Sequence, residues 1–110
     1  MRAHRLARSS DIRRCLVTGR RSRMEHLDMI WVSNDTGHPR MGLIVPRFQS
    51  SAVARNRIRR RLREVWRREI QARQPAWDLL VRARPKAYRA NFATLRGELL
   101  AWRDLVMPLG

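Results

Sequence analysis

An arginine-rich segment with an apolar stripe inside it constrains the fold of this chain more than any other feature of its sequence. Nine of the 24 residues from position 50 to position 73 are arginine. Apolar side chains nevertheless recur at helical spacing within the segment, at Ala54, Ile58, Leu62, Val65, Trp66 and Ile70. The pattern predicts a helix that packs a narrow stripe against a core and leaves the rest of its surface positive.

The positive charge of this segment is part of a large overall imbalance. The 110 residues include 25 Lys and Arg against nine Asp and Glu, a net charge of +16, and every cation except Lys86 is arginine. Residues 1–23 and 50–73 each carry a net +7. If the fold brings them together, they make one basic surface. A codon usage that favours arginine is the alternative explanation for the arginine count.

The partner is expected to be a polyanion. Six arginines and no acid lie between Arg55 and Arg63, and like charges at i, i+4 destabilise a helix. A membrane-surface helix would need a free apolar face, whereas this stripe is expected in the core. A helix-turn-helix DNA reader needs a second short helix, whereas strands flank this one. Structured RNA fits best; a structural, ribosomal-type RNA-binding protein and a DNA-binding protein remain alternatives.

Length and composition predict one α+β domain over residues 1–110, with a basic arm at about 1–9 and a tail at about 106–110. Cys15 is the only cysteine, so no internal disulfide is expected, and it fits a small core position. No apolar run approaches the roughly 20 residues that span a membrane, and the N-terminus lacks the apolar run of a signal peptide. The expected location is the cytoplasm.

Helices are predicted at both ends of the chain. The first, at about residues 10–18, has Ser9, Ser10 and Asp11 as capping candidates and Gly19 as its stop. Its apolar face consists of Ile12, Cys15 and Leu16. The last helix begins after Asn91 as its cap, and its stripe is Phe92, Leu95, Leu99 and Trp102.

Strands are predicted at residues 26–33, 40–46 and 77–85, the first two joined by the turn cluster at 34–39 into a hairpin. The arginine helix lies between the second and third strands. Ser50 or Ser51 can cap its start, and residues 74–77 end it because Pro75 disfavours helix at the preceding residue. The predicted order is α-β-β-α-β-α, a sandwich of helices packed on a small sheet.

No catalytic centre is predicted in the protein. The three histidines are scattered, and no His, Cys, Asp or Glu cluster has metal-ligand spacing. His26 and Asp28 share a face of an alternating strand, but a cross-strand or surface role is favoured over an acid–base pair. No Gly-rich phosphate loop or nucleophile elbow is present.

The central segment resembles a known family. The stretches "RMGLIVP" and "SSAVARNRIRRRLREVWR", with Arg55-Asn56-Arg57 at the centre, are similar to the signature of the bacterial ribonuclease P protein component. "HRLARSSDIRRCLVTG" is similar to the family's opening segment, and "WDLLVRARPKA" to its third strand and the following turn. The resemblance spans roughly residues 4–105.

The resemblance implies a function and a fold. The family's protein is a small subunit of a ribonucleoprotein endonuclease, a hydrolase whose catalytic RNA removes the 5′ leader of precursor tRNA with RNA-bound Mg²⁺. The partners it implies are that RNA and precursor tRNA, with no membrane, no small-molecule substrate and no cofactor held by the protein alone. The implied fold is that of the second domain of ribosomal protein S5, with a left-handed β-α-β crossover.

The resemblance also implies two sets of site residues. RNA-binding residues are Arg55, Asn56, Arg57, Arg59, Arg60, Arg61 and Arg63, assisted by Arg5, Arg8 and Arg47. Leader-cleft residues are Ile12, Leu16, Trp31 and Phe48.

Two departures from the family pattern bear on the leader. Ile12 and Leu16 stand where the family often has aromatic side chains, which predicts a weaker grip on leader bases. Trp31 compensates or packs in the core. In the loop "RFQSS", Arg47 keeps a charge, but Phe48 replaces a second cation and Ser50-Ser51 replaces a Gly-Asn turn.

Overall fold

A computed structural model of the chain describes residues 5–48, 50–72 and 75–106. Residues 1–4 of the predicted arm and 107–110 of the predicted tail lie outside this range. The elements in chain order are α1 (Ser9–Thr18), β1 (Arg20–Arg23), β2 (Leu27–Ser33), β3 (Arg40–Ile44), α2 (Ala52–Val65) with its π-helical continuation η2 (Trp66–Ile70), β4 (Trp77–Ala83), the 3₁₀ turn η3 (Pro85–Arg89) and α3 (Phe92–Val106).

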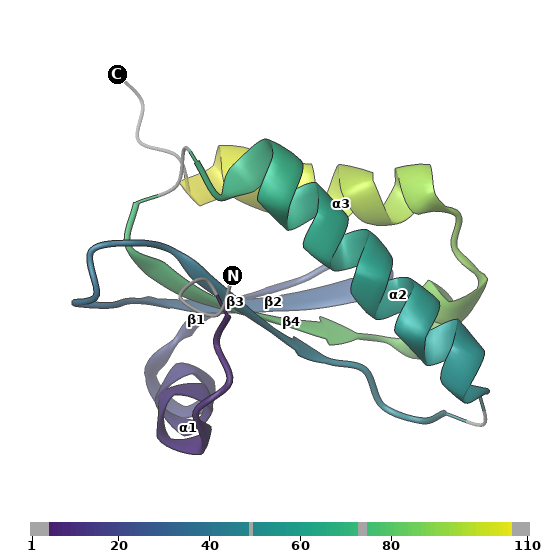
Figure 1. The fold of residues 1–110 in the computed structure, drawn as a ribbon, viewed down its shortest axis with the longest axis horizontal. Helices are drawn as coiled ribbons and strands as arrows, with labels where there is room; N and C mark the ends of the chain where they lie inside the picture. The colour runs from purple at the N-terminus through teal and green to yellow at the C-terminus, as the bar shows by residue number, and fades with distance from the viewer. Residues whose placement is uncertain (1–4, 49, 73–74, 107–110) are drawn as a thin grey trace.

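One four-stranded sheet, in the order β1-β2-β4-β3, forms the centre of the domain. β2 is antiparallel to β1 and to β4, whereas β3 runs parallel to β4. Helices α2 and α3 cover one face of the sheet, and α1 covers the other (Figure 1). The predicted single α+β domain of helices packed on a small sheet is confirmed.

The predicted hairpin of residues 26–33 and 40–46 is wrong. β4 pairs with β2 from Leu27–Ala83 to Ser33–Trp77 and separates it from β3. The reason lies in burial, because three consecutive β4 residues, Leu79, Leu80 and Val81, are fully buried. A strand that is apolar on both faces belongs at the centre of a sheet covered by helices on both sides.

The short edge strand β1 was not predicted. Its sequence is Arg-Arg-Ser-Arg, which shows none of the apolar alternation that marks a strand. It forms because its backbone pairs with β2, from Arg20–Trp31 to Arg23–Asp28. Its charged side chains suit an exposed edge, where they discourage pairing with another chain. The observed order is therefore α-β-β-β-α-β-α.

Strand alternation divides the apolar side chains between two cores. The larger core lies between the sheet and helices α2 and α3, and it contains Met29 and Trp31 of β2 with Trp102 of α3. The smaller core lies on the α1 side and consists of Leu6, Cys15, Ile30 and Leu80. The predicted α3 stripe is correct at Leu95, Leu99 and Trp102, which are buried, but not at Phe92, which is 39% exposed.

Two of the predicted helix caps are confirmed. The Ser51 hydroxyl accepts a hydrogen bond from the Ala54 amide at 3.1 Å, and the Asn91 side-chain oxygen accepts one from the Thr94 amide at 2.8 Å. Each satisfies an amide that has no partner within its helix. The continuous helical segment that begins after Ser51 ends at Ile70, before Pro75. The end was predicted at residues 74–77, of which residue 74 lies outside the described residues.

The capping prediction for α1 is wrong, whereas its stop is correct. The N-cap is Arg8, without a side-chain hydrogen bond, and Ser9, Ser10 and Asp11 lie inside the helix. Gly19 ends the helix with an extended backbone. A Cβ at Gly19 would lie 2.4 Å from the Cys15 carbonyl oxygen. Glycine is therefore required because the backbone of Cys15 comes so close, and not because the residue has a left-handed conformation.

Candidate nucleic-acid interface

Helix α2 has the two faces that its sequence predicts. Its inward stripe and that of η2 are buried at Ile58, Leu62, Val65, Trp66 and Ile70, all 4% exposed or less. The arginines occupy the remaining surface, where Arg57, Arg60 and Arg63 are exposed and Arg55, Arg59 and Arg61 are half-buried. The core anchors the helix, so its cations are held on a rigid element.

The N-terminal arm runs along the free edge of β3. Arg5 forms a parallel bridge with Met41, and the Leu6 amide donates to the Met41 carbonyl oxygen at 3.0 Å. Leu6 then packs into the core on the α1 side, and a Cβ at Gly42 would lie 2.6 Å from the Leu6 carbonyl oxygen. The absence of a side chain at Gly42 therefore permits this close contact.

A groove of about 510 Å³ lies where the arm meets α2. Its lining residues are Arg5, Met41, Asn56, Arg59, Arg60, Arg63, Glu64, Trp66, Arg67 and Gln71. The predicted convergence of the two basic segments is thus confirmed at Arg5. Arg67 was not in the predicted site, although Asn56, Arg60, Arg63 and Arg67 follow the spacing of one helix face, and that spacing was the available signal. We call this surface the arginine groove.

Partial burial and the crowding of positive charge in the arginine groove both act on the pKa of Arg63. Partial burial lowers the pKa of its guanidinium below the ordinary value, and the like charges of Arg5 and Arg59 add to the effect. Arg59 also donates to the Asn56 side-chain oxygen at 3.2 Å, which gives Asn56 a hydrogen-bonding role on the helix surface. An anion in the groove would relieve the repulsion among these side chains.

The other predicted RNA-binding residues lie outside the lining of the groove. The Arg55 Nε donates to the Val45 carbonyl oxygen at 3.3 Å. Arg57 and Arg61 extend from other positions of α2, Arg8 caps α1, and Arg47 lies in the loop between β3 and α2. The structure therefore gathers Arg5, Asn56, Arg59, Arg60 and Arg63 into one groove and spreads the remaining five over the neighbouring surface.

Ion pairing leaves the arginines at positions 55–63 without acidic partners. Eight of the nine acids contact basic side chains elsewhere, in the pairs Asp11–Arg40, Glu25–Lys86, Asp28–Arg23, Glu64–Arg67 and Arg68, Glu69–Arg96, Asp78–Arg40 and Arg14, Glu98–His26 and Asp104–Arg103. Within the described part of the chain, no acid lies within ion-pair distance of Arg55–Arg63. These six cations therefore repel one another without a counter-charge from the described protein, and an external anion would stabilise this surface.

The four predicted leader-cleft residues do not lie together. Ile12 and Leu16 are half-buried against the smaller core, with Val32 and Ile44 beside them. Trp31 is only 6% exposed on the opposite face of the sheet, where its ring centroid lies 6.0 Å from that of Trp102. Of the two roles expected for Trp31, the structure shows packing in the core and not a place beside Ile12 and Leu16, because strand alternation turns it away from its neighbours Ile30 and Val32.

Phe48 is separate from both groups. It follows β3 in the loop that leads to α2, and its ring contacts Tyr88 of η3 rather than the residues around α1. The centroids of the two rings are 5.7 Å apart and their planes are nearly perpendicular. Tyr88 was not among the predicted site residues, and its sequence context carries no signal for this contact.

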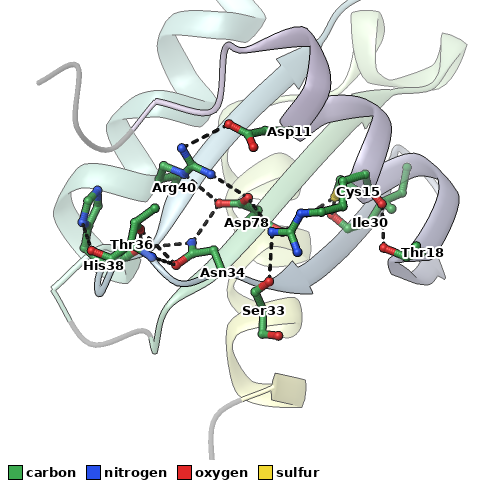
Figure 2. A network of polar contacts seen from close by, with 11 residues as sticks. Asp11, Cys15, Thr18, Ile30, Ser33, Asn34, Thr36, His38, Arg40 and Asp78 are labelled. Carbon is green, nitrogen blue, oxygen red and sulfur yellow. Dashed lines mark hydrogen bonds and ion pairs between the residues drawn. The ribbon is translucent and has the colours of Figure 1, made fainter.

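A buried polar network fixes α1 to the sheet (Figure 2). The fully buried Asp78 carboxylate accepts two hydrogen bonds of 2.8 Å from Arg40 and one of 2.8 Å from Asn34, and Arg14 lies 3.4 Å away. Arg40 also contacts Asp11 of α1 at 3.4 Å. Because every charge here has a partner, the network indicates a structural role rather than a reactive site.

Other titratable groups are likewise engaged in structure. The Nδ1 atom of His26 lies 2.5 Å from a Glu98 carboxylate oxygen, so the candidate His26–Asp28 pair does not form; Asp28 contacts Arg23 at 3.5 Å. Burial, with the nearby Asp78 charge, raises the pKa of the Cys15 thiol to about 11. Within residues 5–48, 50–72 and 75–106, no group of three or more His, Cys, Asp or Glu side chains is placed to hold a metal ion. None of the described helices is long and apolar enough to cross a membrane.

The fold and the arginine groove together define a class: a single-domain α+β protein with a surface suited to a large polyanion. Comparison with known proteins gives the family. Residues 1–105 match the model of the ribonuclease P family. A ribonuclease P protein component from Syntrophobacter fumaroxidans is 41% identical over 99 residues, which cover 88% of this chain and 82% of that protein. One from Acidothermus cellulolyticus is 38% identical over 97 residues, covering 86% and 81% respectively.

Solved structures agree with the sequence relatives. The ribonuclease P protein from Thermotoga maritima superposes with a TM-score of 0.83 at 26% identity, covering 94% of this chain and 98% of that chain. The chain belongs to the ribonuclease P protein family. It is a protein component of the tRNA-processing ribonuclease, in which the RNA subunit carries out catalysis.

Proposed function

We propose that this chain binds the catalytic RNA of ribonuclease P through the arginine groove and the adjoining surface of α2, and thereby assists removal of the 5′ leader from precursor tRNA. The observation that carries the proposal is the arginine cluster at positions 55–63, which has no acidic partner among the described residues and is joined by Arg5 from the arm. Guanidinium groups bind phosphate oxygens through paired hydrogen bonds. A folded RNA presents such phosphates in a fixed arrangement.

The protein's contribution is to bind and position RNA. Arg59, Arg60 and Arg63 converge on one groove, so a phosphate bound there contacts several guanidinium groups and relieves their mutual repulsion. Mg²⁺ ions held by the RNA supply the hydrolytic chemistry. The cytoplasm, where a bacterium processes its tRNA, is the proposed location.

The leader is proposed to lie on the α1 side of the domain. Ile12 and Leu16 are half-buried there beside Ile44 of β3, and the loop with Arg47 and Phe48 follows that strand. This surface offers aliphatic contacts and a nearby cation to a single strand. Trp31 is excluded because its side chain lies in the other core.

Reconstitution tests the proposal directly. The full chain is mixed with a bacterial ribonuclease P RNA and precursor tRNA at low Mg²⁺, and leader release is measured with and without the chain. We expect faster cleavage when the chain is present, because its cations reduce the electrostatic cost of bringing two RNAs together. Unchanged cleavage would contradict the proposal.

A matched pair of variants locates the interface. Arg60→Ala with Arg63→Ala removes two charges from the groove. Arg20→Ala with Arg23→Ala removes two from β1, the strand at the opposite edge of the sheet from β3. We expect the first pair to weaken binding of the catalytic RNA by at least about tenfold and the second to change it much less. Equal losses would assign the effect to net charge rather than to the groove.

A further inference from the structure

Phe48 has an unusual backbone conformation in an exposed place. Its φ is 38°, and among the described residues it is the only one other than glycine with a positive φ. Bulky side chains rarely adopt this region. The residue is 45% exposed, although it carries one of the larger apolar side chains of the protein. Strained residues of this kind concentrate at binding sites, where the surrounding structure holds them in place.

The contacts around Phe48 hold its ring at the surface. The Tyr88 ring lies against it, with centroids 5.7 Å apart and planes at 86°. The Tyr88 hydroxyl in turn donates to the Pro46 carbonyl oxygen. On the other side, the Ser50 amide and hydroxyl donate to the Arg47 carbonyl oxygen at 2.7 and 2.5 Å. Hydrogen bonds to the Pro46 and Arg47 carbonyl oxygens therefore hold the backbone next to the exposed Phe48 ring.

Arginines lie near this aromatic pair, two as its chain neighbours and others from α2. Arg47 precedes Phe48 and Arg89 follows Tyr88, and both are exposed. Arg55 donates to the Val45 carbonyl oxygen at 3.3 Å, which places its guanidinium beside the same loop. Burial raises the pKa of the Tyr88 hydroxyl, and the nearby charges of Arg55 and Arg59 act in the opposite direction. An exposed aromatic ring among arginines is the combination that binds a single-stranded nucleotide, whose base stacks while its phosphates pair with cations.

We propose that Phe48, supported by Tyr88, stacks on one unpaired base of the bound RNA while Arg47 and Arg55 contact its flanking phosphates. The inference rests on the proposed function, because it takes RNA as the partner. It adds a base-stacking position at the loop before α2, in a chain whose α1 offers Ile12 and Leu16 rather than aromatic rings. The base comes either from the leader or from the catalytic RNA.

Three substitutions of Phe48 distinguish stacking on an RNA base from mere shielding of Tyr88. Phe48→Trp keeps an aromatic face, Phe48→Leu keeps apolar cover for Tyr88 without one, and Phe48→Ala removes both. All three residues carry a Cβ at the same positive φ, so they share the backbone constraint. If Phe48 only shields Tyr88 and its hydrogen bond to Pro46, leucine should restore function. If it stacks on a base, only tryptophan should do so.

The experiment measures binding of precursor tRNA by the reconstituted holoenzyme. Its substrates are precursor tRNAs with one abasic nucleotide placed at successive leader positions. We expect Phe48→Leu and Phe48→Ala to weaken binding about tenfold and Phe48→Trp to bind nearly as the unsubstituted chain does. With the unsubstituted chain, one abasic leader position should weaken binding of precursor tRNA by the same factor. With Phe48→Ala, the same abasic position should weaken binding no further. This pair of results would identify the leader as the source of the base.

A second arm measures binding of each variant to the catalytic RNA without precursor tRNA. The base comes from the catalytic RNA if Phe48→Leu and Phe48→Ala weaken binding in this arm while Phe48→Trp does not, and if precursor tRNAs with abasic leaders bind as tightly as the intact substrate. Unchanged binding of Phe48→Ala in both arms, or full rescue by Phe48→Leu, would overturn the stacking proposal. The Arg60→Ala, Arg63→Ala variant is measured in parallel. If it loses RNA binding while the Phe48 variants do not, the proposed function stands and the stacking inference alone fails.

Discussion

Asp78 shows how one residue can hold several elements in place. Its fully buried carboxylate, at the second position of β4, joins Arg40 of β3, Arg14 of α1 and Asn34 of the turn after β2. A buried carboxylate is tolerated only when paired and hydrogen-bonded, and this one has four such contacts. It ties α1 to the face of the sheet opposite the arginine groove.

Removal of this carboxylate should be costly. We expect Asp78→Ala to lower the free energy of unfolding by about 3–5 kcal/mol, because Arg40 would keep a largely buried charge without its main partner. Urea denaturation followed by circular dichroism measures the loss. Arg23→Ala is the control, since the Arg23–Asp28 pair is on the surface with Arg23 75% exposed, and should cost no more than about 1 kcal/mol. Equal costs would contradict the role given to Asp78.

Gly42 of β3 allows the N-terminal arm to lie close against the strand. A Cβ there would lie 2.6 Å from the Leu6 carbonyl oxygen, so we expect Gly42→Ala to push the arm away from β3 and move Arg5 out of the groove. Affinity for the catalytic RNA, measured by filter binding, should fall several-fold while the circular dichroism spectrum is kept.

Gly97→Ala is the matched control for that substitution. Nothing lies within 4 Å of a Cβ at Gly97, which is inside α3, so alanine there should stabilise the helix by up to about 1 kcal/mol and leave RNA affinity unchanged. If Gly42→Ala binds RNA as well as Gly97→Ala does, the arm is not part of the interface.

At the scale of an element, α2 assigns opposite roles to adjacent residues. Arg57 is exposed and has no ion-pair or hydrogen-bond partner among the described residues, whereas Ile58 is 4% exposed in the main core. This division follows from helical geometry, since consecutive residues point about 100° apart. A single turn of α2 therefore carries both the contact with the protein core and the contact proposed for RNA.

Two neighbouring substitutions test this division. Arg57→Ala should weaken RNA binding by several-fold and leave the melting temperature nearly unchanged, because no described contact is lost. Ile58→Asp should unfold the domain or lower its stability by several kcal/mol, because it buries an unpaired charge. Circular dichroism melting and RNA binding are measured for both variants. Comparable unfolding by the two would show that the faces of α2 are wrongly assigned.

For the whole molecule, the distribution of charge matters more than its total. The acids pair with basic side chains on α1, β1, β3, η2, η3 and α3 or with His26. Among the described residues, none of them pairs with the six arginines at positions 55–63, so this part of the net charge of +16 stays unneutralised on α2. Long-range attraction to a polyanion follows from such an arrangement, and it is screened by salt.

Salt dependence measures how many phosphates the surface neutralises. If about six arginines do so, the logarithm of RNA affinity should fall with the logarithm of salt concentration with a slope of roughly −4 to −5. The Arg60→Ala, Arg63→Ala variant should flatten the slope by about 1.5 to 2. Binding isotherms at increasing KCl concentrations provide both values, and a nearly flat slope for the unsubstituted chain would contradict phosphate contact.

Local features of this protein were readable from its sequence. The two faces of α2, the caps Ser51 and Asn91 and the strand segments around residues 27–33 and 77–83 all depend on residues close together in the chain. Periodicity and capping act over a few residues, so they survive in any fold that the chain adopts. The family motif around Arg55-Asn56-Arg57 likewise lies in one continuous stretch.

Long-range pairing was decided only by the tertiary structure. β4 inserts between β2 and β3, and β1 forms from an all-polar segment. Trp31 packs in the core opposite Ile12, and Arg5, paired with β3, lines one groove with residues of α2. Each of these depends on which distant surfaces bury the most apolar area and satisfy the most backbone groups together. The chemistry of the arginine groove was therefore present in the sequence, but the partners that shape it were selected by the cooperative packing of the whole domain.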